Sequence, residues 1–174
     1  MVLQHQVFMH NTLTAANHAG RLTERDAVVM NRVLERPESF ESESTQRRYA
    51  SAADKVVKAL LFVDEPKLAS PVRGTADFAS DFSSHGPFDS DGRSFRRLNL
   101  QSRLFEWPCS FLVYSSAFQN LPVGVMTRVE ARLSEVLSGR DGSGDYDHLS
   151  ERTRADILQI LRETTKLNLE VTGG

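Results

Sequence analysis

The spacing of its apolar residues restricts what this chain can fold into more than any other feature. Apolar side chains recur every three or four positions over most of its length, which is typical of amphipathic helices. The clearest stripe holds apolar residues at i, i+3, i+4, i+7 and i+8, namely Ala53, Val56, Val57, Leu60 and Leu61. The segment 97–101 (RLNLQ) alternates instead, but no partner strand is evident, so we favour a helix or irregular structure there. The pattern predicts an all-α fold: a single-domain orthogonal bundle of six or seven helices over residues 1–174.

Capping residues and helix breakers indicate where the early helices begin and end. Residues 2–19 predict a first helix that stops at Gly20, and Thr23 is placed to cap a second helix. Residues 37–50 (PESFESESTQRRYA) are polar and repetitive in Glu and Ser, which predicts a mobile loop or linker. Ser51 is then expected to cap the helix that carries the clearest apolar stripe.

The second half of the chain is divided by glycine, proline and serine. Residues 84–101 begin with SHGPFDSDGRS, whose turn-forming residues predict an irregular loop. Pro122 suits the first turn of a later helix, and Gly139 is expected to terminate that helix. Ser150 is expected to cap the last helix.

The overall charge argues against two classes of partner. The chain carries 21 Lys and Arg against 23 Asp and Glu. No net field attracts nucleic acid or an anionic membrane, so we expect no nucleic-acid partner. No apolar stretch approaches the roughly 18–20 residues that cross a bilayer, so we expect no membrane span. The first residues (MVLQHQVFMHNTL) lack the basic region, apolar core and cleavage site of a signal peptide, and the compartment stays open.

The single cysteine, Cys109, lies in the aromatic-rich run FEWPCSFLVYSSAF at residues 105–118. One cysteine excludes an internal disulfide and a zinc site built from several cysteines. Pro108 suits the start of a helix, and a helix from Pro108 to Phe118 is apolar on two faces, which predicts a buried central position. We expect Cys109 to be a small buried apolar side chain. A reactive thiol, with its pKa lowered by the helix N-terminus, and a metal or haem ligand are the alternatives.

Four arginines within eleven residues form a candidate surface for an anion or a protein partner. They are Arg93, Arg96, Arg97 and Arg103. Guanidinium groups bind carboxylate and phosphate in a bidentate manner. Aspartates lie close upstream, among them Asp89 and Asp91, and internal salt bridges to them are the interpretation that we favour.

Two further patterns are candidates for cofactor binding. The turn GRDGSGDYD presents oxygen-bearing side chains at alternate positions: Asp141, Ser143, Asp145 and Asp147. This is the ligand rhythm of a calcium loop, but Tyr146 replaces the glycine of the sixth position and Arg152 the glutamate of the twelfth. His5 and Met9 share a helical face and match a pair of haem ligands, although no C-x-x-C-H motif is present. We therefore expect no cofactor, with calcium and haem as the alternatives.

Three short motifs carry a resemblance to a known group of proteins. They are GPFDSDGRS, RLFEWPCS and the LP at 121–122, in the order GP-x-D-x-x-GRS, RLF-x-x-PCS and LP. The segment of about residues 55–165 resembles the C-terminal region of long, poorly characterised bacterial proteins. The resemblance implies a bacterial source, a module of a larger chain and an exported parent protein. It implies no activity, so it assigns no role to any residue.

These observations lead to three functional hypotheses. We expect a non-catalytic helical module that packs against other domains of its own chain or a protein partner, with residues 86–109 as its most distinctive surface. The second hypothesis is a ligand-binding or cofactor-binding domain for haem or calcium. The third is a thiol-dependent enzyme that uses Cys109.

Overall fold

The fold is all-helical, as the apolar spacing predicts. The computed structural model describes residues 1–66, 68–72 and 76–170. Its helices are α1 (Val2–Val33), α2 (Glu43–Leu60), α3 (Ala76–Ser84), the 3-10 turn η1 (Phe111–Tyr114), α4 (Ser116–Gln119), α5 (Val123–Leu137) and α6 (Glu151–Thr164). Within the described residues the only β pairing is an isolated antiparallel bridge between Leu98 and Phe105. Among these helices, none has both the length and the apolar character that crossing a membrane requires.

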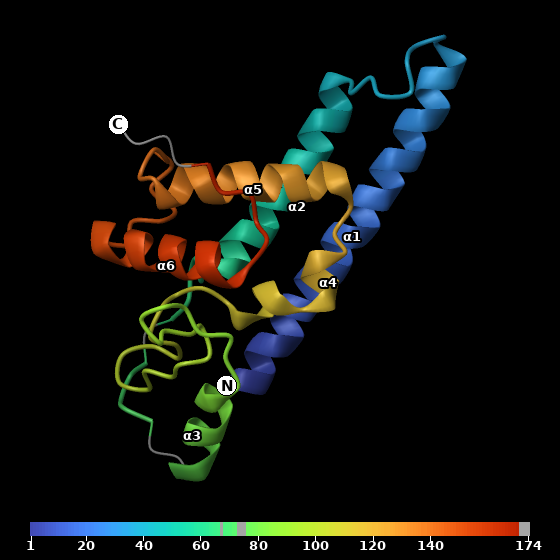
Figure 1. Ribbon diagram of the computed structural model, residues 1–174. Coiled ribbons are helices and arrows are strands. Elements are labelled where there is room, and N and C mark those ends of the chain that lie inside the picture. The colour runs from blue at the N-terminus through green and yellow to red at the C-terminus, as the bar shows by residue number, and fades with distance from the viewer. Residues whose placement is uncertain (67, 73–75, 171–174) are drawn as a thin grey trace.

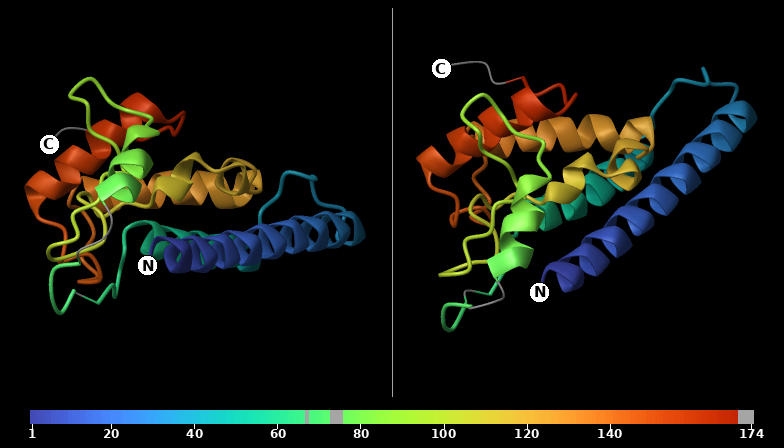
Figure 2. Two further views of the ribbon diagram at one scale, coloured as in Figure 1. Left: turned by 90° about the horizontal axis from the view of Figure 1, so that it is seen from below. Right: turned by 60° about the horizontal axis from the view of Figure 1, so that its bottom comes forward.

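The helices form two layers. α1 and α2 make an antiparallel hairpin, and its far end projects beyond the rest of the molecule (Figure 1). α5 packs across this hairpin and contacts both of its helices, while α6 packs against α5. Figure 2 shows α4, α5 and α6 on one side of the hairpin. The opposite face of the hairpin is not covered by any helix of the described chain.

α1 is one continuous helix, so the predicted break at Gly20 is wrong. A Cβ at Gly20 would lie 2.7 Å from Cγ2 of Val125 and 2.8 Å from Cγ of Pro122. The glycine therefore permits a close approach of α5 and does not end the helix. Thr23, expected as a cap, is buried within α1 and its hydroxyl donates to the carbonyl of Ala19 at 2.8 Å. At Gly20, packing against α5 outweighs the local preference of the residue.

The predicted loop at 37–50 is too long, because α2 begins at Glu43. The Oγ of Ser42 accepts the backbone N–H of Thr45 at 3.1 Å and caps the helix. Ser51, expected as the cap, lies two turns inside α2. The polar composition of this segment reflects the exposed face of a helix and not a linker, since an amphipathic helix that projects from the body exposes most of its first turns.

The run around Cys109 is not the single helix that the sequence suggests. Only residues 111–114 and 116–119 are helical, each for about one turn. The Oγ of Ser110 accepts the N–H of Leu112, and the Oγ of Ser115 accepts the N–H of Phe118, both at 3.2 Å. Each serine caps a new turn, with extended backbone at the cap, and this competition with the backbone prevents one long helix.

The segment 97–101 pairs with the residues that directly follow it. The N–H of Asn99 donates to the carbonyl of Leu104 at 3.0 Å, and the N–H of Glu106 donates to the carbonyl of Arg97 at 2.9 Å. Residues 97–106 thus form a short hairpin-like turn within the irregular region that the sequence predicted around 84–101. The partner was missed because each arm is too short to show a period.

The ends of α5 and α6 follow the sequence predictions. Pro122 stands at the N-cap of α5, and Gly139 follows the C-cap with a φ of 76°. The Oγ of Ser150 caps α6 by accepting the N–H of Thr153 at 3.2 Å. Between these ends, Val129 and Leu133 of α5 are fully buried in the core.

We expect Gly20→Ala to lower the free energy of unfolding by about 1–3 kcal/mol, because its Cβ would overlap α5. Where no other helix packs against the glycine, the same change in a helix stabilises the protein by up to about 1 kcal/mol. The sign of the change in the free energy of unfolding therefore shows whether α5 lies close to Gly20. Urea denaturation measures the difference. Gly142→Ala is the control, since nothing lies within 4 Å of its Cβ, and it should change stability by less than about 0.5 kcal/mol. A stabilised Gly20→Ala variant would contradict the close approach.

Candidate functional site

The four arginines of the predicted anion surface do not share a partner. The guanidinium of Arg93 pairs with Asp89 at 2.7 Å and with Asp156 of α6 at 2.8 Å. Arg93 therefore ties the irregular loop to α6. It also pairs with Asp91 at 3.2 Å, so the favoured salt-bridge interpretation holds at Arg93 for both Asp89 and Asp91. Arg96 instead lies over the ring of Phe111 at 4.7 Å and donates to the carbonyl of Gly86.

The other two arginines lie on opposite arms of the 97–106 turn. Arg97 is exposed and Arg103 is half-buried. Neither forms a salt bridge within the described part of the chain. Because Arg93 and Arg96 are both engaged internally, the cluster offers separate cations and not one convergent anion site.

The turn considered as an alternative calcium site is held by basic side chains. Asp141 pairs with Arg132 of α5 at 2.6 Å, and its carboxylate also accepts the hydroxyl of Ser143 at 2.8 Å. Asp145 pairs with Lys58 of α2 at 2.9 Å. In the part of the chain that the structure describes, no group of three or more His, Cys, Asp or Glu side chains is arranged to hold a metal ion.

Asp147 is exposed at the end of the same turn, and its backbone N–H donates to the carbonyl of Gly144 at 3.3 Å. The turn is therefore held by internal hydrogen bonds and by ion pairs to α2 and α5. This is the geometry of an interhelical turn.

Cys109 is inside the core. Its side chain is 1% exposed, and burial raises the pKa of its thiol well above the ordinary value. A thiol is nucleophilic as the thiolate, so both burial and the raised pKa oppose reactivity. The position is that of a small apolar side chain between the 97–106 turn and η1.

We expect Cys109 to react with a thiol reagent at neutral pH only as fast as the whole domain unfolds, since its sulfur is shielded. Labelling followed by mass spectrometry, with and without urea, measures this. Cys109→Ser should lower the free energy of unfolding by roughly 1–3 kcal/mol, because it buries a poorly paired hydroxyl. Rapid labelling of the native protein would contradict the assignment and favour the thiol-enzyme hypothesis.

His5 and Met9, the candidate haem pair, are both occupied by the fold. The Nε2 of His5 hydrogen-bonds the Oγ of Ser110 at 2.7 Å, and its ring stacks on Phe62 at 4.6 Å between centroids. Met9 is completely buried in the core. Burial lowers the pKa of His5 from 6.5 to about 4, so its ring is neutral at pH 7.

The lowered pKa of His5 predicts a loss of stability in mild acid. Between pH 6.5 and 4 the unfolded chain binds a proton that the folded chain excludes, so the free energy of unfolding falls as pH decreases. We expect His5→Gln to reduce the fall in the free energy of unfolding between pH 6.5 and 4 by up to about 2 kcal/mol. The full change in the pKa of His5 would imply more, but the ring is partly exposed to solvent.

Urea midpoints at several pH values, compared between the parent and His5→Gln, isolate the contribution of His5 from that of the carboxylates. His18→Gln is the control, since His18 is exposed on the same helix. An identical pH slope in the parent and His5→Gln would show that His5 titrates normally.

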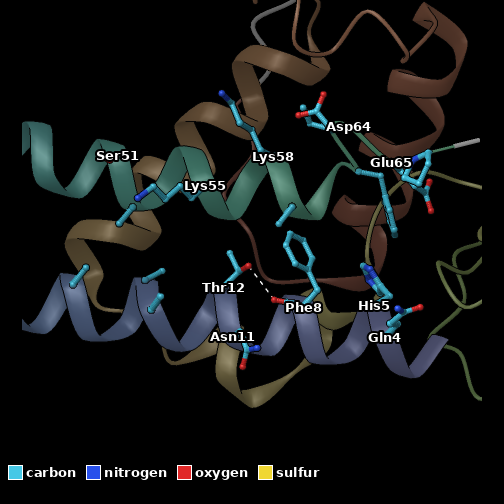
Figure 3. A pocket seen from close by; sticks show the side chains of 18 of the residues that line it. Gln4, His5, Phe8, Asn11, Thr12, Ser51, Lys55, Lys58, Asp64 and Glu65 are labelled. Atoms are coloured by element: carbon cyan, nitrogen blue, oxygen red, sulfur yellow. Dashed lines mark hydrogen bonds between the residues drawn. The ribbon is translucent and has the colours of Figure 1, made fainter. Parts of the chain in front are cut away.

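A long concave groove lies between α1 and α2. It encloses about 1370 Å³ and lies on the face of the hairpin that α5 leaves open (Figure 3). On α1 its lining extends from Met1 to Thr23, a span of about 33 Å at 1.5 Å per residue. No residue of α4, α5 or α6 lines it within the described chain. We call this feature the α1–α2 groove.

Small side chains line the middle of the α1–α2 groove. Ala15 and Ala19 of α1 are exposed in it, and Ser51 and Ala52 of α2 face them. Larger apolar residues line the end near Met1, among them Phe8, which is 58% exposed. Small residues on two neighbouring helices allow a third helix to come close to both.

Charge is unevenly distributed along the α1–α2 groove. The α2 wall carries four cations: Arg47, Arg48, Lys55 and Lys58. The lining residues of α1 carry no acidic or basic side chain other than His5. Two acidic residues, Asp64 and Glu65, lie at the end near Met1, and burial raises the pKa of Glu65. The α2 wall of the groove is therefore basic, the α1 wall is neutral, and the end near Met1 is acidic.

The acidic end of the groove has an unusual backbone. Phe62 and Asp64 have φ values of 57° and 63°, in the left-handed region that costs a residue other than glycine about 1–3 kcal/mol. The N–H of Val63 donates to the carbonyl of Lys58, which closes α2 with Phe62 in the position that glycine ordinarily takes. This conformation turns the chain away from the axis of α2 and sets Phe62 against His5.

The α1–α2 groove was not among the features predicted from the sequence. The most distinctive surface was expected at 86–109, and of those residues only Leu104 lines the groove. A usable signal was present: Ala15 and Ala19 repeat at i, i+4, and α2 alternates small and basic residues at helical spacing from Ser44 to Lys58. Apolar stripes mark buried faces, so a face of alanine, serine and cations was not recognised.

Comparison with models of protein families, with curated proteins and with solved structures gives no match for this chain. The site is therefore interpreted from its geometry.

Proposed function

We propose that this chain is a non-catalytic helical interaction module of a larger bacterial protein, and that its α1–α2 groove binds a helix. The helix comes from another domain of the parent chain or from a protein partner. The observation that carries the proposal is the groove itself, which is about as long as a helix of twenty residues and is lined by small and apolar side chains.

Packing geometry supports a helix as the occupant. Helices in contact lie 8–10 Å apart when small side chains meet at the interface. Ala15, Ala19 and Ala52 provide such a surface on both helices of the hairpin. A bound helix would form a third member on the open face, opposite α5, and would cover the exposed ring of Phe8.

The non-catalytic part of the proposal is supported by the state of the candidate reactive groups. The sulfur of Cys109 is buried, and His5 is engaged by Ser110. The carboxylates of Asp141 and Asp145 are paired with Arg132 and Lys58. The bacterial source and the larger parent chain are supported by the resemblance of GPFDSDGRS and RLFEWPCS.

We expect helical peptides of about twenty residues, selected from a displayed library, to bind the parent chain at a 1:1 ratio. Ala15→Trp and Ala19→Trp should each weaken their binding at least tenfold, because an indole fills the groove. Ala131→Trp, an exposed position on α5, is the control and should bind within twofold of the parent. Fluorescence titration measures affinity, and circular dichroism checks that all variants fold.

Peptides that bind the two groove variants as tightly as the parent would overturn the proposal. So would saturable binding of a fluorescent fatty acid, blocked by Ala15→Trp, in the absence of any helical peptide that binds. That second result would assign the groove to an elongated apolar ligand.

A further inference from the structure

Resting on the proposed function, we infer that the α1–α2 groove takes an acidic amphipathic helix in one orientation, parallel to α1, with its N-terminus beside Asp64 and Glu65. The occupant's chemistry follows from the charges of the two walls, and its direction follows from the charges of the two ends.

The basic wall of α2 selects acidic side chains on one flank of the bound helix. Lys55 forms no salt bridge with any described residue. Arg47 and Arg48 pair with Glu43 and Asp26 on the surface, and their side chains remain 72% and 46% exposed. Exposed pairs of this kind contribute little, so both arginines can exchange to a new carboxylate.

Lys58 does not contribute to this recognition, because its ammonium group is held by Asp54 at 3.3 Å and by Asp145 at 2.9 Å. The facing wall of α1 is lined by neutral residues such as Gln4, Asn11 and Thr12. The bound helix therefore has an apolar stripe toward the floor, acidic residues toward α2 and neutral polar residues toward α1.

The two ends of the groove distinguish the two orientations of a helix. Asp64 and Glu65 lie at the end near Gln4 and His5 (Figure 3), whereas Arg47 and Arg48 lie at the end near Thr23. A helix carries a partial positive charge at its N-terminus and a partial negative charge at its C-terminus. Placing the N-terminus at the acidic end matches both terminal charges, and reversing the helix opposes both.

The distribution of bulk in the lining adds a second distinction. Phe8 and Phe62 narrow the acidic end, while Ala15 and Ala19 leave room toward the basic end. A helix bound parallel to α1 therefore places its larger apolar side chains opposite Ala15 and Ala19, where the lining is small.

The test uses a designed peptide of about twenty residues. It carries a leucine stripe, a row of glutamates on one flank and glutamines on the other, with a nitroxide at either its first or its last residue. In NMR spectra of the parent chain, the N-terminal nitroxide should broaden the signals of Gln4 and Phe8. The C-terminal nitroxide should broaden those of Ala19 and Leu22.

Charge variants test the recognition of the acidic flank. We expect Lys55→Gln and Arg47→Gln each to weaken binding about fivefold and to reduce its dependence on salt. Arg152→Gln, an exposed arginine outside the groove, is the control and should leave the affinity unchanged. A peptide in which lysines replace the glutamates should bind at least tenfold more weakly.

The outcomes separate the inference from the proposed function. A reversed broadening pattern, or the same pattern for both nitroxides, overturns the orientation and leaves a helix-binding groove. Equal affinity for the glutamate and lysine peptides overturns the acidic class of partner. If neither these peptides nor any library-selected helix binds saturably, the proposed function itself fails.

Discussion

The close approach of α5 to the α1–α2 hairpin is the contact on which the rest of the structure depends. It is made by a glycine on each side: Gly20 lets α1 meet Pro122, and Gly124 lies so near the ring of Tyr49 that an added Cβ would be 2.6 Å away. Because neither glycine has a side chain to hold the helices apart, α5 packs directly on the hairpin at both places. That covers one face of the hairpin and leaves the other as the α1–α2 groove.

Ion pairs hold the acidic turn and the irregular loop against the helices. Arg132 of α5 connects to Asp54 of α2 at 3.6 Å and to Asp141 of the acidic turn, and lies over the ring of Tyr146. Arg93 plays the corresponding role for the irregular loop, which it fastens to Asp156 of α6. Residues that look like ligands in the sequence are thus used to join segments distant in the chain. Arg93 and Arg132 are thereby engaged within the fold, whereas Arg47, Arg48 and Lys55 of the groove remain accessible to a partner.

The helical class and several helix ends could be read from the sequence because they follow local rules. Gly139 and Ser150 lie at helix ends, where each takes the role that its residue type favours locally. Gly20 carries the same kind of signal but lies where α1 packs on α5, and packing overrides it. Ser110 and Ser115 show the opposite case, since local capping divides a run that looked like one helix.

The small-residue signal of the groove could not be interpreted from the sequence alone, for a different reason. Ala15 and Ala19 have the composition of a core face, and only the placement of α5 decides that they stay exposed. Similarly, the burial of Cys109 was expected from its apolar neighbours, but its partners were not. The spacing of residues in the sequence shows which face of a helix is apolar. It does not show which helix faces pack together, because that depends on contacts between residues about a hundred positions apart.

The hydrogen bonds that hold α1 also determine when it can be completed during folding. His5 bonds a residue 105 positions later, and the side chain of Asn17 donates to the carbonyl of Asn120, 103 positions later. Closing loops of that length carries an entropic cost before any contact is gained. The hairpin can form early from adjacent segments, yet these two hydrogen bonds of α1 must wait for the arrival of η1 and α4. This bundle is therefore expected to fold more slowly than helical proteins whose contacts are local.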